Sequence, residues 1–190
     1  MSTTKLATYD AKVIRLAQTC QAHQDVRPFL NGIWLHPDGT VYGSDGHTAA
    51  RSKNFQPSPL DFPVLINMKM ISKLADLVLF DFGTNKAAVL RVLNDGSRKL
   101  INTLKFTVDE SIGPDFDQVI PSDVPGAKPV DMIGLNAQYL SRLSVFADYG
   151  KYHGLKAHLR TPSDAAKFVP TDMDWHHSTC MVIMPMKLPK

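Results

Sequence analysis

One stretch of the sequence is not explained by amino-acid composition alone: Ala22-His23-Gln24-Asp25-Val26-Arg27-Pro28-Phe29-Leu30-Asn31-Gly32-Ile33. Before it, Asp10 is a suitable N-cap for a helix that ends near Gln21 and has apolar residues at helical spacing. From Arg27 the stretch merges into a strand that we expect to end at His36, where Pro37-Asp38-Gly39 favours a hairpin turn. The stretch therefore leads from a helix into the first strands of a sheet.

The order strand, helix, then further strands occurs three times. The first copy has strands at 5–9, 27–36, from 40 and near 44–51, with a helix at 10–21. The second has strands at 62–66, 87–93 and 98–106, with a helix at 68–79. The third has strands at 130–135, 155–161, 166–169 and 179–188, with a helix at 136–149. A repeat of roughly sixty residues predicts an α+β fold of three strand–helix–three-strand units, with helices on one face of antiparallel sheets.

Apolar residues at helical spacing predict the buried faces of the second and third helices. They are Met70, Ile71, Leu74, Leu77 and Val78 in the second helix, and Tyr139, Leu140, Leu143 and Ala147 in the third. Residues 122–129 contain two prolines and a glycine and are expected to form a linker. We therefore predict one domain at 1–125 and a smaller one at 126–190.

The bulk composition is typical of a globular protein, with 190 residues, 44% hydrophobic and 21% charged. No apolar run approaches the roughly eighteen residues of a membrane span, and the first residues lack a signal-peptide core. Cys20 and Cys180 are too few for a disulfide scaffold and form no zinc pattern, so we expect a cytoplasmic protein. The formal net charge of +3 permits contact with DNA without requiring it.

Basic residues outnumber acidic ones on the polar faces of the three expected helices. Lys12 and Arg15 are three residues apart, Lys69 and Lys73 are four apart, and Arg142 lies in the third helix. Cations in such rows could contact DNA phosphates without reading bases. The same pattern is also typical of a solvated helix face whose charges serve only solubility.

Four blocks of sequence, in this order, together resemble one known family. The stretch 22–33 is similar to the start of the middle domain of the bacterial beta sliding clamp, the processivity subunit of DNA polymerase III. The other blocks resemble a turn, the end of the middle domain and the C-terminal tail of that family; they are Ser44-Asp45-Gly46-His47, Gly113-Pro114-Asp115-Phe116-Asp117-Gln118-Val119-Ile120-Pro121 and Val182-Ile183-Met184-Pro185-Met186-Lys187-Leu188. Residues up to about 125 thus match the whole middle domain, and those from about 128 match only the second half of the C-terminal domain.

In that family, a pocket between the middle and C-terminal domains binds short linear peptides of polymerases, the clamp loader and repair proteins. The resemblance implies a pocket here formed by Leu30, Ser44, Gly46, His47, Thr48, Ala49, Pro114, Gln118, Val119, Val182, Ile183, Met184, Pro185 and Met186. Its Leu, Val, Ile and Met side chains suit an aliphatic or aromatic residue. The family has Arg-Leu at Thr48-Ala49 and arginine at Gln118, so affinity and partner choice are expected to differ.

The family also encircles duplex DNA, with its helices facing the hole. The resemblance implies non-specific phosphate contacts from Lys12, Arg15, Gln24, Lys69, Lys73 and Arg142, with Pro28 and Phe29 near the same loop. A family ring has twelve units, so a homo-oligomer is expected: four chains, or two chains whose third units form one domain. The alternative is a peptide-binding decoy or adaptor that competes for clamp partners and never encircles DNA.

The sequence offers no complete catalytic or metal-binding motif. His176-His177 with Asp172 and Asp174 match no standard ligand set. A glycine-rich phosphate loop is absent, and Asp45 and His47 are not accompanied by a serine in a Gly-x-Ser-x-Gly elbow. We therefore predict a binding protein that is not an enzyme and uses no cofactor.

Overall fold

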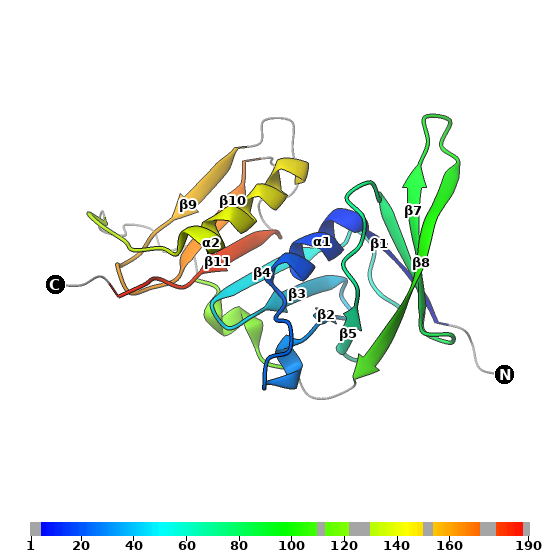
Figure 1. Cartoon of the computed structure of the whole chain (residues 1–190), viewed down its shortest axis with the longest axis horizontal. Helices are drawn as coiled ribbons and strands as arrows, with labels where there is room; N and C mark the ends of the chain where they lie inside the picture. Colours follow the sequence, from blue (N-terminus) through cyan, green and yellow to red (C-terminus); the bar gives the residue numbers. More distant parts are fainter. Residues whose placement is uncertain (1–4, 110–112, 122–129, 150–153, 172–177, 188–190) are drawn as a thin grey trace.

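The computed structural model describes residues 5–109, 113–121, 130–149, 154–171 and 178–187, without the side chain of Asp148. Within these ranges, eleven antiparallel strands form one continuous sheet in the order β1-β6-β7-β8-β5-β2-β3-β4-β11-β10-β9 (Figure 1). Helices are few, and the predicted α+β class is confirmed. No helix in the described ranges is both long and apolar enough to span a membrane.

The first unit has the predicted order of a strand, a helix and three strands. It contains β1 (Leu6–Asp10), α1 (Ala11–Cys20), a short 3₁₀ helix η1 (Pro28–Leu30), β2 (Ile33–Leu35), β3 (Thr40–Ser44) and β4 (Thr48–Lys53). Asp10 is the N-cap of α1, since its carboxylate accepts a hydrogen bond of 2.8 Å from the Lys12 amide. The strand expected from Arg27 begins only at Ile33, because Pro28 has no amide hydrogen and starts η1 instead.

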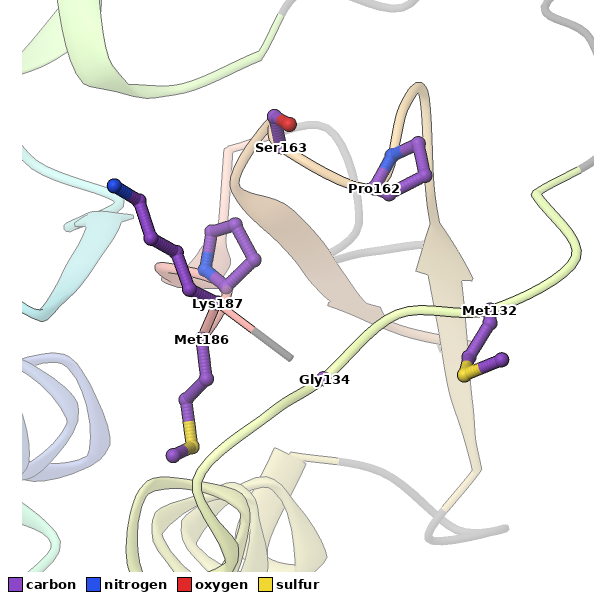
Figure 2. A pocket seen from close by; sticks show the side chains of 7 residues that line it. Met132, Gly134, Pro162, Ser163, Met186 and Lys187 are labelled. Atoms are coloured by element: carbon purple, nitrogen blue, oxygen red, sulfur yellow. The ribbon is translucent and has the colours of Figure 1, made fainter. Parts of the chain in front are cut away.

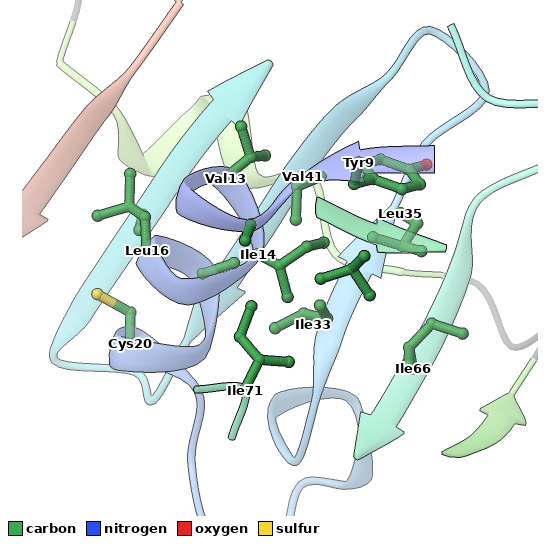
Figure 3. Close-up of a cluster of buried hydrophobic side chains, with 14 of the residues drawn as sticks. Tyr9, Val13, Ile14, Leu16, Cys20, Ile33, Leu35, Val41, Ile66 and Ile71 are labelled. Carbon is green, nitrogen blue, oxygen red and sulfur yellow. The ribbon is translucent and has the colours of Figure 1, made fainter. Parts of the chain in front are cut away.

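Helix α1 buries its apolar face on the sheet (Figure 3). Val13, Ile14 and Leu16 are fully buried in the same core as Ile33 and Leu35 of β2. Each such aliphatic side chain contributes about 1.5–3 kcal/mol when it is removed from water. This core fixes α1 in position beside β3 and β4, which carry the turn described below.

The second unit has four strands and no helix, so the helix predicted at 68–79 is wrong. β5 (Val64–Met68) leads through a non-helical segment, residues 69–76, into β6 (Leu77–Asp81), followed by β7 (Lys86–Val92) and β8 (Arg98–Asp109). Burial alternates along β6, with Val78 and Phe80 buried, which is the two-residue period of a strand. Met70 and Leu74, which were predicted to face the core, are 57% and 63% exposed.

Two polar side chains of α1 bind backbone groups of segment 69–76. Gln18 donates to the Lys69 carbonyl at 3.1 Å and accepts from the Ile71 amide at 3.0 Å. Arg15 donates to the Ala75 carbonyl at 2.9 Å. Buried backbone groups need partners, and these side chains supply them where a helix would have used its own amides and carbonyls.

The third unit begins with α2 (Ala137–Ser141), which continues as a 3₁₀ helix, η3 (Arg142–Tyr149). The helix predicted at 136–149 is therefore present but is α-helical only in its first part, and Leu140, predicted to face inward, is 37% exposed. The opening strand predicted at 130–135 is reduced to a single bridge between Gly134 and Met186. The predicted linker at 122–129 lies outside the described residues.

The strands of the third unit extend the sheet of the first. They are β9 (Leu155–His158), β10 (Ala166–Pro170) and β11 (Cys180–Ile183), and β11 pairs with β4 from Cys180 opposite Arg51 to Ile183 opposite Thr48. The last strand, predicted to reach 188, ends at Ile183, because Pro185 has no amide hydrogen to continue the ladder. The first and third units thus share one sheet.

Candidate functional site

The C-terminal tail lies beside the turn that joins β3 to β4. After β11, the Met184 amide donates to the His47 carbonyl at 2.9 Å, and the Met186 amide donates to the Gly134 carbonyl at 2.8 Å. The tail is therefore held between the first and third units. Two of the four sequence blocks, the turn at 44–47 and the tail, meet at this place.

The turn between β3 and β4 is fixed by its own hydrogen bonds. Asp45 Oδ1 accepts from the amides of His47 at 2.9 Å and Thr48 at 2.7 Å. The Ser44 hydroxyl donates to the Thr48 carbonyl at 2.9 Å. Gly46 has a φ of +86°, a conformation that suits glycine. The turn consequently presents the exposed His47 ring from a well-defined backbone.

Arg142 of η3, in the third unit, binds this turn and holds it in place. Its Nη1 lies 2.6 Å from Asp45 Oδ2 and also donates to the Thr48 hydroxyl. The guanidinium lies 5.0 Å from the centre of the Tyr139 ring, which stacks on His47 at 5.7 Å. Burial raises the pKa of the Asp45 carboxyl, but the Thr48 and His47 amides and Arg142 together lower it below its usual value. Arg142 is therefore committed to a partner inside the chain.

The third sequence block is docked against the same sheet. It forms η2 (Phe116–Val119), and the Phe116 ring stacks on Tyr42 of β3 with centroids 4.9 Å apart. Ile120 packs on the small cluster that contains Val182 of β11. Val119 at the end of η2 is 43% exposed.

A cavity of about 430 Å³ opens beside the tail (Figure 2). Its lining consists of Met132, Gly134, Pro162, Ser163, Pro185, Met186 and Lys187. Three methionines near it are exposed: Met132 by 66%, Met184 by 43% and Met186 by 52%. Sequence reasoning included Pro185 and Met186 but missed the residues before α2 and between β9 and β10, because only tertiary packing brings those segments to the tail.

The predicted pocket residues divide into two sets. The exposed or half-buried set contains Gly46, His47, Pro114, Gln118, Val119, Met184, Pro185 and Met186. The buried set contains Leu30, Ser44, Thr48, Ala49, Val182 and Ile183. The second set is buried and does not line an exposed surface in this structure. We use "tail groove" for the exposed set together with the cavity lining.

The predicted phosphate contacts do not form one row. Arg15 is only 7% exposed and bonds the backbone of segment 69–76, so its prediction as a phosphate contact is corrected. Arg142 is likewise engaged, with Asp45. Gln24, with a φ of +58°, and Lys69 line a common cavity of about 470 Å³. The remaining predicted contacts, Lys12, Gln24, Lys69 and Lys73, are at least partly exposed.

Within the described residues, no group of three or more His, Cys, Asp or Glu side chains is arranged to hold a metal ion. Asp172, Asp174, His176 and His177 lie outside those residues. Asp45 and His47 are adjacent in the turn, where the carboxylate binds backbone amides and Arg142. The exposed side chains of the tail groove are mostly apolar, with His47 and Gln118 among its polar members.

Solved structures of known proteins share this architecture, although no protein-family model and no curated protein matches the chain. The beta subunit of DNA polymerase III from Pseudomonas aeruginosa is 16% identical over 97% of this chain and 67% of that chain, with a TM-score of 0.63. The Bartonella birtlesii sliding clamp is 16% identical over 99% and 68%, with a TM-score of 0.67. The Bacillus subtilis sliding clamp is 13% identical over 100% and 66%, with a TM-score of 0.65.

The chain therefore has the fold of a DNA sliding clamp. In particular, it has the fold of the bacterial DNA polymerase III beta subunit, over about two thirds of that subunit's length. The resemblance inferred from the four sequence blocks is confirmed at the level of the fold.

Proposed function

We propose that this chain is a sliding-clamp-like accessory protein of DNA replication or repair that binds linear peptides of partner proteins in the tail groove. The observation that carries the proposal is the junction of the tail with the β3–β4 turn, where Met184 is hydrogen-bonded to His47. Its action would be that of an adaptor, which tethers a partner and raises the partner's local concentration at DNA. Catalysis forms no part of the proposal.

The chemistry of the tail groove supports a peptide ligand. Methionine side chains are flexible and polarisable, so they adapt to aliphatic or aromatic residues. The cavity of about 430 Å³ lies within the size range of ligand pockets. Among the solved structures of this fold, the Bartonella birtlesii clamp is bound to griselimycin, and one Pseudomonas aeruginosa clamp carries a ligand. These complexes support the use of the fold as a ligand receptor.

Association with duplex DNA in an oligomer is the second part of the proposal. Within the described residues, β9 pairs with β10 only, so the third unit ends in an edge that another chain could cover. Light scattering over a concentration series tests this part, and we expect more than one chain per particle. A monomer at every concentration would exclude encirclement and leave the peptide-binding decoy or adaptor.

Peptide binding is tested with a fluorescently labelled linear clamp-binding peptide of the polymerase type. Met184→Ala and His47→Ala are each expected to weaken binding by about tenfold or more, because central interface residues carry much of the binding energy. Met70→Ala is the matched control, since Met70 is 57% exposed and lines a different cavity. Unsaturable binding, or equal binding by all three variants, would contradict the proposal.

A further inference from the structure

The β7–β8 hairpin, residues 86–105, accounts for the net positive charge of the whole chain. It contains Lys86, Arg91, Arg98, Lys99 and Lys105, and one acidic residue, Asp95. The chain has 21 basic and 18 acidic residues in total, so the other 170 residues hold 16 basic and 17 acidic ones. Outside the hairpin, the chain is thus close to neutral. Such a concentration of charge on one element is a specific feature of the surface.

All five basic side chains are exposed, and none forms an ion pair within the described part of the chain. Two acidic side chains outside the hairpin lie beside it: Asp81 of β6, opposite Lys86, and Asp76, whose carboxylate accepts a hydrogen bond of 2.8 Å from the Val92 amide. The carboxylate of Asp81 is bound mainly by Thr84, and Lys86 contributes last to the lowering of its pKa. The five cations are therefore available to an external anion.

The cations also face one another. Lys86 lies directly opposite Lys105, and Arg91 lies directly opposite Lys99, in the β7–β8 register. Side chains at such positions are about 5 Å apart at their Cβ atoms, and like charges there destabilise a strand pair. An anion between or beside these pairs would remove the repulsion. The arrangement is unfavourable for folding alone and favourable for binding a polyanion.

The distal part of the hairpin, from Arg91 to Lys99, is a two-stranded ribbon that extends beyond β6 (Figure 1). β6 pairs with β7 only as far as Leu90, and β5 pairs with β8 only from Phe106 onward. The tip is ordered, since Gly96 has a φ of +80° and the Ser97 amide donates to Asp95 at 2.9 Å. Among described residues, no strand covers the other edge of β8 over residues 98–105.

The spacing of the cations favours duplex DNA over an acidic peptide. Lys99 and Lys105 are six residues apart, or about 20 Å along a strand at about 3.4 Å per residue. A two-stranded ribbon fits the major groove, which is about 12 Å wide, so the part with Arg91, Arg98 and Lys99 can enter it. Lys86 and Lys105, where β6 also pairs with β7, then lie toward phosphates on its rim. An acidic strand added to the free β8 edge would instead leave the β7 cations, Lys86 and Arg91, one strand further away.

We infer that the β7–β8 hairpin is a DNA-binding ribbon that contacts the phosphates of duplex DNA without reading sequence. The inference rests on the DNA-associated part of the proposed function and does not depend on the tail groove. It places the main phosphate contacts on a β-ribbon, whereas the sequence pattern had pointed to helix faces.

The test is fluorescence anisotropy with a labelled DNA duplex of mixed sequence, over a series of salt concentrations. The variant R91Q/K99Q removes one opposed pair, and K156Q/R160Q removes two exposed cations from the third unit as the matched control. We expect R91Q/K99Q to weaken binding about tenfold and to reduce the slope of log K against log salt by about 2, because each lost phosphate contact changes it by about 0.9. The control should bind within about twofold of the unaltered chain.

Three outcomes would overturn the inference: no binding of duplex at low salt, equal losses in the two variants, or a larger loss in K156Q/R160Q. Polyglutamate that binds as tightly as the duplex at the same salt concentration would indicate that the ribbon binds an acidic protein. That result would overturn the inference as well. Thermal unfolding checks the fold of R91Q/K99Q, whose melting temperature should not fall, because a repulsive pair is removed. The peptide titration on the same variants should be unchanged, so failure of the ribbon is distinguished from failure of the tail groove.

Discussion

Arg142 connects the third unit to the β3–β4 turn through a single guanidinium group. Its side chain is 26% exposed and that of Asp45 is 13% exposed, so the pair is partly shielded from water. In the sequence, Arg142 is one more basic residue on a helix face, with nothing to separate it from Lys69 or Lys73. Arg142 reaches its partner Asp45, which is 97 residues away in the sequence, only because η3 packs on the first unit.

Replacing Arg142 with methionine should lower the free energy of unfolding by about 1–2 kcal/mol at neutral pH, because Asp45 loses a charge-assisted hydrogen bond. The pKa of Asp45 is lowered in the folded chain, so this contribution is present above the usual carboxyl pKa of about 4 and is lost as pH falls through the lowered value. The difference between variant and unaltered chain should therefore shrink below about pH 4. Urea denaturation at several pH values measures it.

Arg160→Met is the control for that measurement. Arg160 lies 3.9 Å from Asp164, and both side chains are more than 40% exposed, so the loss should be under about 0.5 kcal/mol. A loss in Arg142→Met that is no larger than in the control, or that does not change with pH, would contradict the role of Arg142 as a brace.

Segment 69–76 shows how an element can be misassigned from its pattern. Ile71 and Val78 are buried as helical spacing predicts, yet Met70 and Leu74 are exposed. The decisive partners of this segment are Gln18 and Arg15 of α1, which are more than fifty residues away. A local pattern contains no information about such partners.

Gln18→Met should destabilise the chain by about 1–3 kcal/mol, because the Lys69 carbonyl and the Ile71 amide would lose buried hydrogen bonds. The loss of stability should be local as well as global. In the variant, the exchange rate of the Ile71 amide hydrogen should therefore rise more than the rates of the neighbouring amides in β5. Hydrogen exchange followed by NMR measures both effects. Gln138→Met, at an exposed position of α2, is the control and should leave exchange at Ile71 unchanged. Unchanged protection in Gln18→Met would show that the segment is held by other contacts.

The elements that could be predicted from the sequence are those with local causes. The Asp10 cap fixes the start of α1, and Gly39 and Gly96 mark two hairpins with positive φ. The turn and tail blocks were placed together only through the family resemblance, and the fold brings them into contact. Met132, Pro162 and the brace by Arg142 could not be predicted, because they depend on how the third unit packs on the first.

At the scale of the whole molecule, one sheet carries two separate surfaces. The tail groove lies where β4 and β11 join the first and third units, and the basic ribbon projects from the second unit. Both surfaces belong to a fold that corresponds to about two thirds of the length of the bacterial clamp subunit. Under the proposed function, the separation of the two surfaces would let a peptide and DNA bind at the same time.

The most direct test of peptide binding is an NMR titration of the chain, labelled at its methionine methyl groups, with the linear peptide. The chain has eight methionines, of which Met132, Met184 and Met186 belong to the tail groove. We expect the signals of these three to shift and saturate together, while those of Met70 and the buried Met68 stay in place. Shifts at Met70 alone, or no saturable shift at any of the three, would contradict a peptide site in the tail groove.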